Sequence, residues 1–251
     1  MRAITLVVPV LNEEGTLAET LRSLRSQTLK EYDLLVVDNG STDRSLEIAR
    51  QWADQVLVEE RPGPAWAMHR GFKAAQGMFI AAADADTVYP ERWLATMVEA
   101  LQKPGVVAVY GPIGFREGGR TSRALTSIGY ALLAGGSRAL GVHQVGAANF
   151  GMRREAYFEA GGYPPVADLV GPDLRLARRL ARLGRVRCVH RLVCYTSNRR
   201  FAGRNVLPAS WGAFRAWLDV ATGREHLRWE SHWGQGSSRR SRVRPLGPKQ
   251  G

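Results

Sequence analysis

Short apolar runs alternate with amphipathic stretches along this chain, and the alternation restricts its fold more than any other feature. Residues 3–10, 34–37 and 78–83 have the composition of short buried strands. Apolar residues recur at helical spacing between them, at Leu17, Leu21 and Leu24, at Leu46, Ala49 and Ala53, and across residues 63–77. Strands separated by helices require right-handed crossovers, so the pattern predicts an α/β fold with a mostly parallel sheet covered by helices on both faces.

Polar residues follow each predicted strand at the point where it ends. Asn12 and Glu13 follow the first strand, Asp38 ends the second, and Asp84 and Asp86 follow the third. Because the carboxyl ends of parallel strands share one edge of a sheet, and ligands bind beyond that edge, these side chains are expected to converge on one rim. Asn12 is also expected to cap the first helix.

Two carboxylates, Asp84 and Asp86, lie one residue apart between the third apolar run and a helix that we expect to begin at Pro90. A carboxylate held in low dielectric must be paired or bound to a metal. Carboxylate oxygens are the ligands of hard divalent cations that carry phosphates. The spacing also arises by chance, so the metal interpretation depends on the strand and the rim around it.

Four segments of the chain resemble, in order, the successive signatures of family-2 glycosyltransferases. They read VVPVLNEEGTLAETLRSL, LLVVDNGSTDRSLEIA, RGFKAAQGMFIAAADAD and GGYPPVADLVGPDLRLARRLARLGRV, and the resemblance covers residues 3–201. It implies the GT-A fold, an α/β Rossmann-like mixed, mostly parallel sheet flanked by helices. Residues 1–205 would form this domain, with a donor half over about 1–110 and an acceptor half over about 111–205. Family alone does not determine the substrate.

The resemblance implies an inverting enzyme that moves a sugar from a UDP- or GDP-sugar to a hydroxyl acceptor, which is a glycan, a lipid-linked compound or a small molecule. The departing diphosphate gains negative charge, which a Mg²⁺ or Mn²⁺ ion held by carboxylates would neutralise. By resemblance, Asp86 is the direct metal ligand, and Asp84 contacts the ribose or binds the metal through water. Ala85 lies beside the donor, and Asp38 accepts hydrogen bonds from the base or the ribose.

The first loop and the residue after Asp38 complete the implied donor site. In the family this loop wraps the nucleoside, and it contains Pro9, Val10 and Glu13. The local alternatives are that Pro9 ends the strand and that Glu13 favours the helix dipole. Asn39 replaces a second aspartate that is common at this position. An amide both donates and accepts, so the choice between uracil and guanine stays open.

Asp173 is the candidate base for the acceptor hydroxyl. Counted back from Gly184, which is expected to end the helix LRLARRLARLG, it occupies the aspartate position of the family's Glu-Asp motif. A base that deprotonates the attacking hydroxyl opposite the leaving group inverts the anomeric centre. Pro172 replaces the glutamate, which leaves two alternatives: Asp173 only caps the helix, or Asp168 shares or takes over its role.

Other candidate residues rest on weaker signals. His190, in the alternating run 186–195, stands for the late histidine that some related transferases use as a metal ligand, or it is a structural strand histidine. Arg199 and Arg200, in a segment that resembles S-x-R-R-F, would bind the diphosphate, or they form a solvated basic turn. Asn149 is the candidate acceptor contact, with a turn asparagine that bonds its own backbone as the alternative.

The two cysteines and the N-terminus favour a cytoplasmic location, with peripheral association at the inner face of the membrane as an extension. Cys188 and Cys194 fall in what reads as one strand, where a disulfide is geometrically unfavourable. Arg2 is followed at once by the first strand rather than by a secretory signal. No apolar run approaches the roughly 20 residues that a membrane span requires.

The C-terminal part carries much of the formal net charge of +12. Residues 206–233 are expected to form an amphipathic helical segment, which is either an interfacial helix or a helix docked on the core. Residues 234–251 form a basic tail that we expect to be disordered, acting as an electrostatic tether to anionic lipid or as a solubilising end. No nucleic-acid motif is recognised, so no specific nucleic-acid partner is expected.

Two other functions compete with glycosyl transfer. A nucleotidyltransferase shares the nucleotide-binding α/β design, but it usually has a glycine-rich, lysine-containing loop after the first strand. The segment VPVLNEEGT does not supply that loop. A degenerate, non-catalytic nucleotide-sugar binder is the second alternative, because Asn39 and Pro172 depart from the family pattern.

Overall fold

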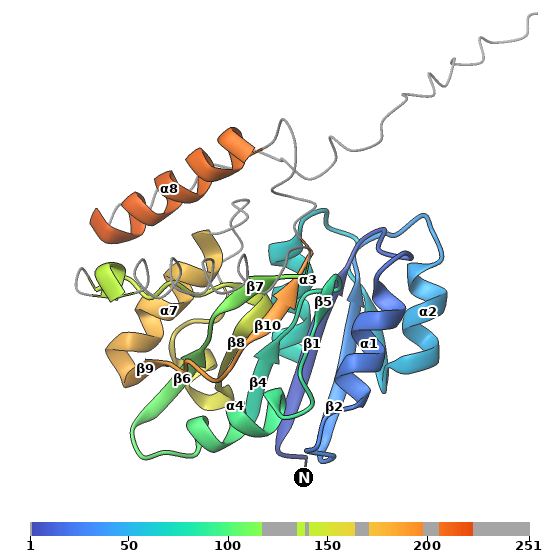
Figure 1. Ribbon diagram of the computed structural model, residues 1–251, viewed down its shortest axis with the longest axis horizontal. Coiled ribbons are helices and arrows are strands. Elements are labelled where there is room, and N and C mark those ends of the chain that lie inside the picture. Colours follow the sequence, from blue (N-terminus) through green and yellow to red (C-terminus); the bar gives the residue numbers. More distant parts are fainter. Residues whose placement is uncertain (1, 117–134, 139–140, 164–170, 198–205, 223–251) are drawn as a thin grey trace, which may run out of the picture.

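Two sheets organise the chain in a computed structural model that describes residues 2–116, 135–138, 141–163, 171–197 and 206–222 (Figure 1). The main sheet has seven strands in the order β3-β2-β1-β4-β8-β6-β9, and the smaller one has three in the order β5-β10-β7. In the main sheet only β8 runs antiparallel to its neighbours β4 and β6. The predicted mixed, mostly parallel α/β architecture is therefore confirmed.

The elements follow one another as strands with intervening helices. The strands are β1 (Ile4–Val10), β2 (Tyr32–Asp38), β3 (Gln55–Val58), β4 (Phe79–Ala82), β5 (Thr87–Val88), β6 (Val106–Tyr110), β7 (Ile113–Phe115), β8 (Phe150–Arg153), β9 (Arg185–Cys188) and β10 (Cys194–Thr196). The helices are α1 (Leu17–Arg25), α2 (Ser45–Trp52), α3 (Pro64–Ala74), α4 (Trp93–Leu101), the 3-10 turn η1 (Ala147–Asn149), α6 (Arg154–Glu159), α7 (Gly171–Leu183) and α8 (Val206–Thr222).

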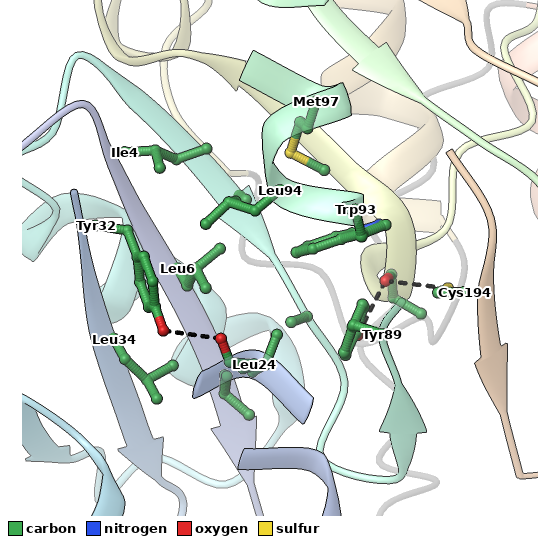
Figure 2. Close-up of a cluster of buried hydrophobic side chains, with 14 of the residues drawn as sticks. Ile4, Leu6, Leu24, Tyr32, Leu34, Tyr89, Trp93, Leu94, Met97 and Cys194 are labelled. Atoms are coloured by element: carbon green, nitrogen blue, oxygen red, sulfur yellow. Dashed lines mark hydrogen bonds between the residues drawn. The ribbon is translucent and has the colours of Figure 1, made fainter. Parts of the chain in front are cut away.

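Helices bury both faces of the main sheet, which is why its strands read as nearly continuous apolar runs. One face of β1, with Ile4, Leu6 and Val8, packs in a core with α1, α2 and α4. Figure 2 shows part of this core, where Tyr32 also donates a hydrogen bond to the carbonyl of Leu24. Val7 faces the opposite core, which α3, α6 and α7 cover.

Several local expectations differ from the structure. Asn12 does not cap α1, because Thr16 precedes the helix and Asn12 adopts a positive φ of 54°. Its side-chain oxygen instead accepts a hydrogen bond from the Thr42 amide, which links the β1–α1 and β2–α2 loops. The helix expected at Pro90 begins at Trp93. The edge strand β3 was not anticipated, because its apolar run is only three residues long, from Val56 to Val58.

Cys188 and Cys194 do not share a strand. Cys188 ends β9 in the main sheet, and Cys194 begins β10 in the small sheet. A turn in which the Leu192 amide bonds the Val189 carbonyl separates them. Both cysteines are free thiols, so the expectation that no disulfide forms is confirmed although the single-strand interpretation was wrong.

α8 docks on the core and also presents apolar side chains to solvent. Val220 packs with Leu174 of α7, and the Trp217 indole donates to the Ser137 hydroxyl at 3.1 Å. The outer side carries three exposed residues, Trp211 (62%), Phe214 (51%) and Leu218 (43%). Among the described helices none is long and apolar enough to cross a bilayer. Residues 223–251, which include the predicted basic tail, lie outside the described part of the chain.

We expect Gly71→Ala to destabilise the fold, although alanine normally favours a helix over glycine by about 1 kcal/mol. A Cβ on Gly71, inside α3, would lie 2.2 Å from Val7 Cγ1 and 3.0 Å from Val37 Cγ2. Both valines are fully buried and β-branched, so they have little room to move. Overpacking of this kind costs about 1–3 kcal/mol, which urea unfolding would measure. Gly15→Ala is the matched control because nothing lies within 4 Å of its Cβ; equal stability of the two variants would contradict the close packing.

Candidate functional site

The segment Asp84–Asp86 leaves the carboxyl end of β4 and turns immediately into β5. The Asp84 amide donates to the Tyr89 hydroxyl at 2.9 Å, and the Thr20 hydroxyl of α1 donates to the Ala85 carbonyl at 2.9 Å. Asp84 is half-buried, and Asp86 is only 4% exposed. The backbone thus fixes both carboxylates at the edge where the sequence predicted them.

The central strand of the small sheet, β10, holds Asp86. β10 pairs with β5, and the Thr196 hydroxyl donates to Asp86 Oδ1 at 3.2 Å. The Ser197 amide donates to the Asp86 carbonyl at 3.3 Å. The segment that resembles S-x-R-R-F therefore begins directly beside Asp86. Arg199 and Arg200 lie outside the described residues, so their contact with a diphosphate stays a prediction.

Two buried side chains next to this edge share one hydrogen-bond acceptor. Tyr89 and Cys194 both donate to the carbonyl of Ala148, at 3.0 and 3.5 Å, and Figure 2 shows the two converging on that oxygen. Burial, together with the nearby Asp84 and Asp86 charges, raises the pKa of the Cys194 thiol well above its usual value. Cys194 is therefore a neutral thiol with a packing role.

Asp38 lies at the carboxyl end of β2, and only one of its two carboxylate oxygens accepts hydrogen bonds from the described residues. Oδ2 accepts hydrogen bonds from the amides of Gly40 and Ser41, at 3.1 and 3.2 Å. Oδ1 is buried and has no hydrogen-bond partner among the residues that the structure describes. A buried acceptor without a partner is costly, and an N–H or O–H group of a ligand would relieve that cost.

Asn39 anchors the loop after β3. Its amide nitrogen donates to the carbonyls of Glu59 and Arg61, both at 2.8 Å, and its oxygen accepts from the Gly63 amide at 2.9 Å. Both amide hydrogens are therefore used. The structure corrects the idea that this amide reads the base, since its donors hold the loop instead.

Asp173 lies in the first turn of α7 with both oxygens engaged. Oδ1 accepts from the Tyr163 hydroxyl at 2.5 Å, and Oδ2 accepts from the Ala147 amide at 3.0 Å. Neither donor belongs to α7, so the alternative that Asp173 only caps its helix does not hold. The helix ends at Leu183, and the Gly184 amide bonds the Leu180 carbonyl as expected. Asp168 lies outside the described residues.

The electrostatics of Asp173 suit a base. Burial raises its pKa to about 7, with a further increase from the Asp84 charge, while the hydrogen bonds from Tyr163 and Ala147 oppose the shift. The influence of Asp84 indicates that the two carboxylates lie within electrostatic range across the rim. A base with a pKa near the working pH is the most effective one for proton transfer.

The first loop contributes less surface than the resemblance implies. Val10 is 1% exposed and Ala85 is 6% exposed, and both pack in the core, so neither side chain is available to a donor. Pro9 and Glu13 are half-buried at the rim. The Glu13 amide donates to the Ser45 hydroxyl at 2.7 Å, which ties this loop to α2.

Asn149 has a structural role, which corrects the prediction that it contacts the acceptor. Its side chain is fully buried. The amide nitrogen donates to the carbonyls of Pro112 and Leu192, and the oxygen accepts from the Trp93 indole at 2.8 Å. Asn149 therefore joins segments near β7, β10 and α4.

The structure does not bring His190 to the two rim carboxylates. His190 is exposed in the turn after β9 rather than inside a strand. Within the described residues, no three His, Cys, Asp or Glu side chains form a group that could hold a metal ion. Asp84 and Asp86 nonetheless fit Mg²⁺ or Mn²⁺, because Mg²⁺ is commonly bound by one or two carboxylates plus the phosphates of the substrate.

Two residues of the site were missed by the sequence interpretation. Thr196 bonds Asp86 across 110 positions of the chain, and no local pattern indicates such a pairing. Tyr163 follows Gly161-Gly162, a pair that signals a turn but not the residue that the turn delivers to Asp173.

Comparisons with known proteins identify the family of the chain. The model of the family described as Glycosyl transferase family 2 matches residues 5–159. Glycosyltransferase AglE of Haloferax volcanii is 33% identical over 120 residues, which are 45% of this chain and 40% of AglE. YibD of Escherichia coli, described as a glycosyltransferase, is 30% identical over 129 residues, 49% of this chain and 38% of YibD. The chain thus matches about two fifths of the length of these curated relatives.

Solved structures share the fold. The mannosyltransferase PcManGT of Pyrobaculum calidifontis, in complex with GDP-Man and Mn²⁺, has a TM-score of 0.66 at 21% identity, covering 89% of this chain and 74% of that one. Glucosyl-3-phosphoglycerate synthase of Mycobacterium tuberculosis, in complex with Mn²⁺, UDP-glucose and phosphoglyceric acid, has a TM-score of 0.63 at 25% identity, covering 88% and 80%.

Proposed function

The chain belongs to glycosyl transferase family 2, whose model matches residues 5–159, and we propose that it transfers a sugar from a nucleoside diphosphate to a hydroxyl acceptor with inversion. The observation that carries the proposal is the buried Asp173 carboxylate, which Tyr163 and Ala147 hold by one oxygen each, with the Asp84 charge near enough to raise its pKa. A site that only binds a nucleotide would use Asp38 and Asp86, and it would have no need for a further buried carboxylate, Asp173, with a pKa near 7. A transferase needs such a group beside the diphosphate.

Each rim residue has a distinct part in the proposed reaction. Asp38 Oδ1 accepts a hydrogen bond from the nucleoside and thereby orients the donor. Asp173 takes the proton of the acceptor hydroxyl, whose oxygen attacks the anomeric carbon opposite the leaving diphosphate. Asp84 and Asp86 would hold Mg²⁺ or Mn²⁺, which when bound stabilises the charge on the departing diphosphate.

The donor and the cation are proposed with support from the structural neighbours. PcManGT is described with GDP-Man and Mn²⁺, and the M. tuberculosis synthase with UDP-glucose and Mn²⁺. Both a UDP- and a GDP-sugar therefore remain donors to test. For the acceptor, the exposed apolar stripe of Trp211, Phe214 and Leu218 favours a lipid-linked hydroxyl compound, with α8 as the site of a peripheral membrane contact.

The nucleotide site predicts stabilisation by the correct nucleoside diphosphate. With Mn²⁺ present, UDP or GDP at about 100 times its Kd would stabilise the native state by about 2.7 kcal/mol, which raises Tm by several degrees. Asp38→Ala should weaken that nucleotide at least about tenfold, since it removes a charged acceptor. Asp33→Ala is the matched control, because Asp33 lies on β2 away from its carboxyl end and pairs with Arg2. Nucleotide affinity left intact in Asp38→Ala would contradict the assignment.

A degenerate, non-catalytic binder would differ from a transferase when the same protein is tested for both nucleotide binding and sugar release. It would show the thermal shift with UDP or GDP but no release of sugar from UDP-glucose, UDP-GlcNAc or GDP-mannose when acceptor extracts are supplied. A nucleotidyltransferase would instead release pyrophosphate from UTP or GTP. Sugar transfer measured with radiolabelled donors separates the three functions.

A further inference from the structure

Tyr163 reaches Asp173 because of the turn that precedes it. Gly161 and Gly162 both have positive φ, 81° and 76°, which favours glycine over residues with a side chain. Their amides bond the carbonyls of Phe158 and Tyr157 at the end of α6. The turn places the Tyr163 amide on the Tyr157 hydroxyl at 3.1 Å and directs the Tyr163 ring into the core.

Packing holds the Tyr163 ring in place. Tyr163 is 5% exposed, and its ring meets Phe72 of α3 edge-on, with centroids 5.5 Å apart. Tyr157 contacts the same phenylalanine ring at 5.4 Å. Since Phe72 contacts the ring and the Tyr157 hydroxyl holds the backbone amide, the Tyr163 hydroxyl lies at a defined point, 2.5 Å from Asp173 Oδ1.

The direction of this hydrogen bond follows from the two groups. Burial and the Asp173 charge raise the pKa of the Tyr163 phenol well above its usual value, so the phenol keeps its proton. It therefore donates to the carboxylate, and a separation of 2.5 Å is typical of an O–H group bonded to a charged oxygen. With the Ala147 amide on Oδ2, each carboxylate oxygen has one donor, and the plane of the carboxylate is set.

We propose that Tyr163 is a positioning residue for the base: its hydroxyl fixes the Asp173 carboxylate in the orientation that receives the acceptor proton. The inference rests on the proposed function, in which Asp173 is that base. Tyr163 itself touches neither substrate nor the reacting atoms. Its effect on transfer should therefore appear in kcat rather than in donor binding, and it should depend on pH.

The groups that face Asp173 define the pH dependence. Asp84 at the end of β4 raises its pKa, whereas the Tyr163 hydroxyl and the Ala147 amide lower it. Tyr157 of α6 adds to the raised pKa of Tyr163, and His69 of α3 lies against the Tyr163 backbone. Removing the Tyr163 hydroxyl takes away a donor to the charged carboxylate, so the pKa of Asp173 should rise.

The test is Tyr163→Phe, which keeps the ring and its contact with Phe72 and removes only the hydroxyl. We expect kcat for sugar release from the best of UDP-glucose, UDP-GlcNAc and GDP-mannose to fall about 10- to 100-fold at pH 6.5. The loss should shrink at pH 8.5, the acidic limb of the kcat profile should move up by about one pH unit, and KM for the donor should change less than about twofold.

Tyr110→Phe is the matched control. Tyr110 is another fully buried tyrosine in the same core, and its hydroxyl lies beside the Cys188 thiol rather than beside Asp173. Its kcat profile should match that of the wild type. A loss in Tyr163→Phe that is the same at every pH would overturn positioning in favour of a general structural effect, as would an unchanged profile.

A substrate-free measurement separates this inference from the proposed function. In metal-free protein, the difference in unfolding free energy between the wild type and Asp173→Asn changes with pH and levels off above the native pKa of Asp173. When the same pair is compared with Tyr163→Phe present in both proteins, the levelling off should move to higher pH, even if no donor is turned over. A levelling off at unchanged pH overturns the role of Tyr163, whereas wild-type turnover by Asp173→Asn overturns the base itself.

Discussion

Asp173→Asn is expected to reduce sugar transfer by about 10²- to 10⁴-fold, the usual contribution of a general base. Asparagine keeps the shape of the side chain, and its oxygen can still accept from the Ala147 amide while its nitrogen donates to the Tyr163 oxygen. It cannot take a proton at neutral pH. Initial rates at saturating donor would show the loss in kcat, with donor affinity unchanged.

The stability of this variant should depend on pH differently from that of the wild type, because the pKa of Asp173 is raised in the native state, whereas carboxyl groups usually have lowered values. The native pKa of about 7 lies above the unfolded value of about 3.9. Between these values the native state holds a proton that the unfolded state has lost, so the contribution of Asp173 to wild-type stability falls as pH rises through this range. The fall is complete above pH 7.

Asp173→Asn removes that fall. In metal-free protein, the variant should equal the wild type near pH 4 and exceed it by a few kcal/mol at pH 8. The other titrating groups are common to both proteins, so the difference reports Asp173 together with its coupling to Asp84. Urea unfolding across pH 4–8 measures it. A variant that is inactive but no more stable at pH 8 would mean that the carboxylate is not held at a raised pKa.

Asp86→Ala is expected to abolish metal-dependent donor binding and to lower transfer by at least about a thousandfold. Asp86 is 4% exposed and is fixed by Thr196, so the chain keeps its carboxylate at the edge of β4. Loss of a carboxylate ligand removes a hard oxygen donor that Mg²⁺ or Mn²⁺ requires. Without that cation, the negative charge on the departing diphosphate is no longer stabilised.

Mn²⁺ titration in the presence of UDP or GDP, followed by the electron paramagnetic resonance of free Mn²⁺, gives a readout that does not depend on turnover. The wild type should take up the ion, and EDTA should reverse the uptake. Asp86→Ala should not bind it, while Asp33→Ala, on the same sheet, should bind as the wild type does. Undiminished uptake by Asp86→Ala would contradict the assigned ligand.

The sequence alone was enough to identify the rim. Asp38 and Asp84 end strands whose apolar periodicity is local, and parallel strands place their carboxyl ends together whatever the details of packing. Asp173 was assigned by resemblance to the family's Glu-Asp motif, and the count back from Gly184 located it because a helix has a recognisable end. For Asp38 and Asp84, neighbouring residues along the chain carry the information needed.

Other residues show where such reasoning fails. Asn149 looked like a ligand contact because a polar residue in a small-residue turn gives no sign that it will be buried among three carbonyl and indole groups. His190 was assigned to a strand because the run 186–195 alternates, and the turn at Val189–Leu192 contains no glycine or proline to reveal it.

The sequence by itself determined the class of fold, the carboxyl rim and the carboxylates on it. Only the tertiary structure decided which groups act on those carboxylates: Thr196 on Asp86, and Tyr163 and Ala147 on Asp173. The physical reason is the order of the strands. β8 inserts between β4 and β6, and β10 pairs with β5, so these contacts join segments far apart in the chain. Local periodicity determines which face of a strand or helix a residue occupies, but it does not determine which residue from another segment lies against it.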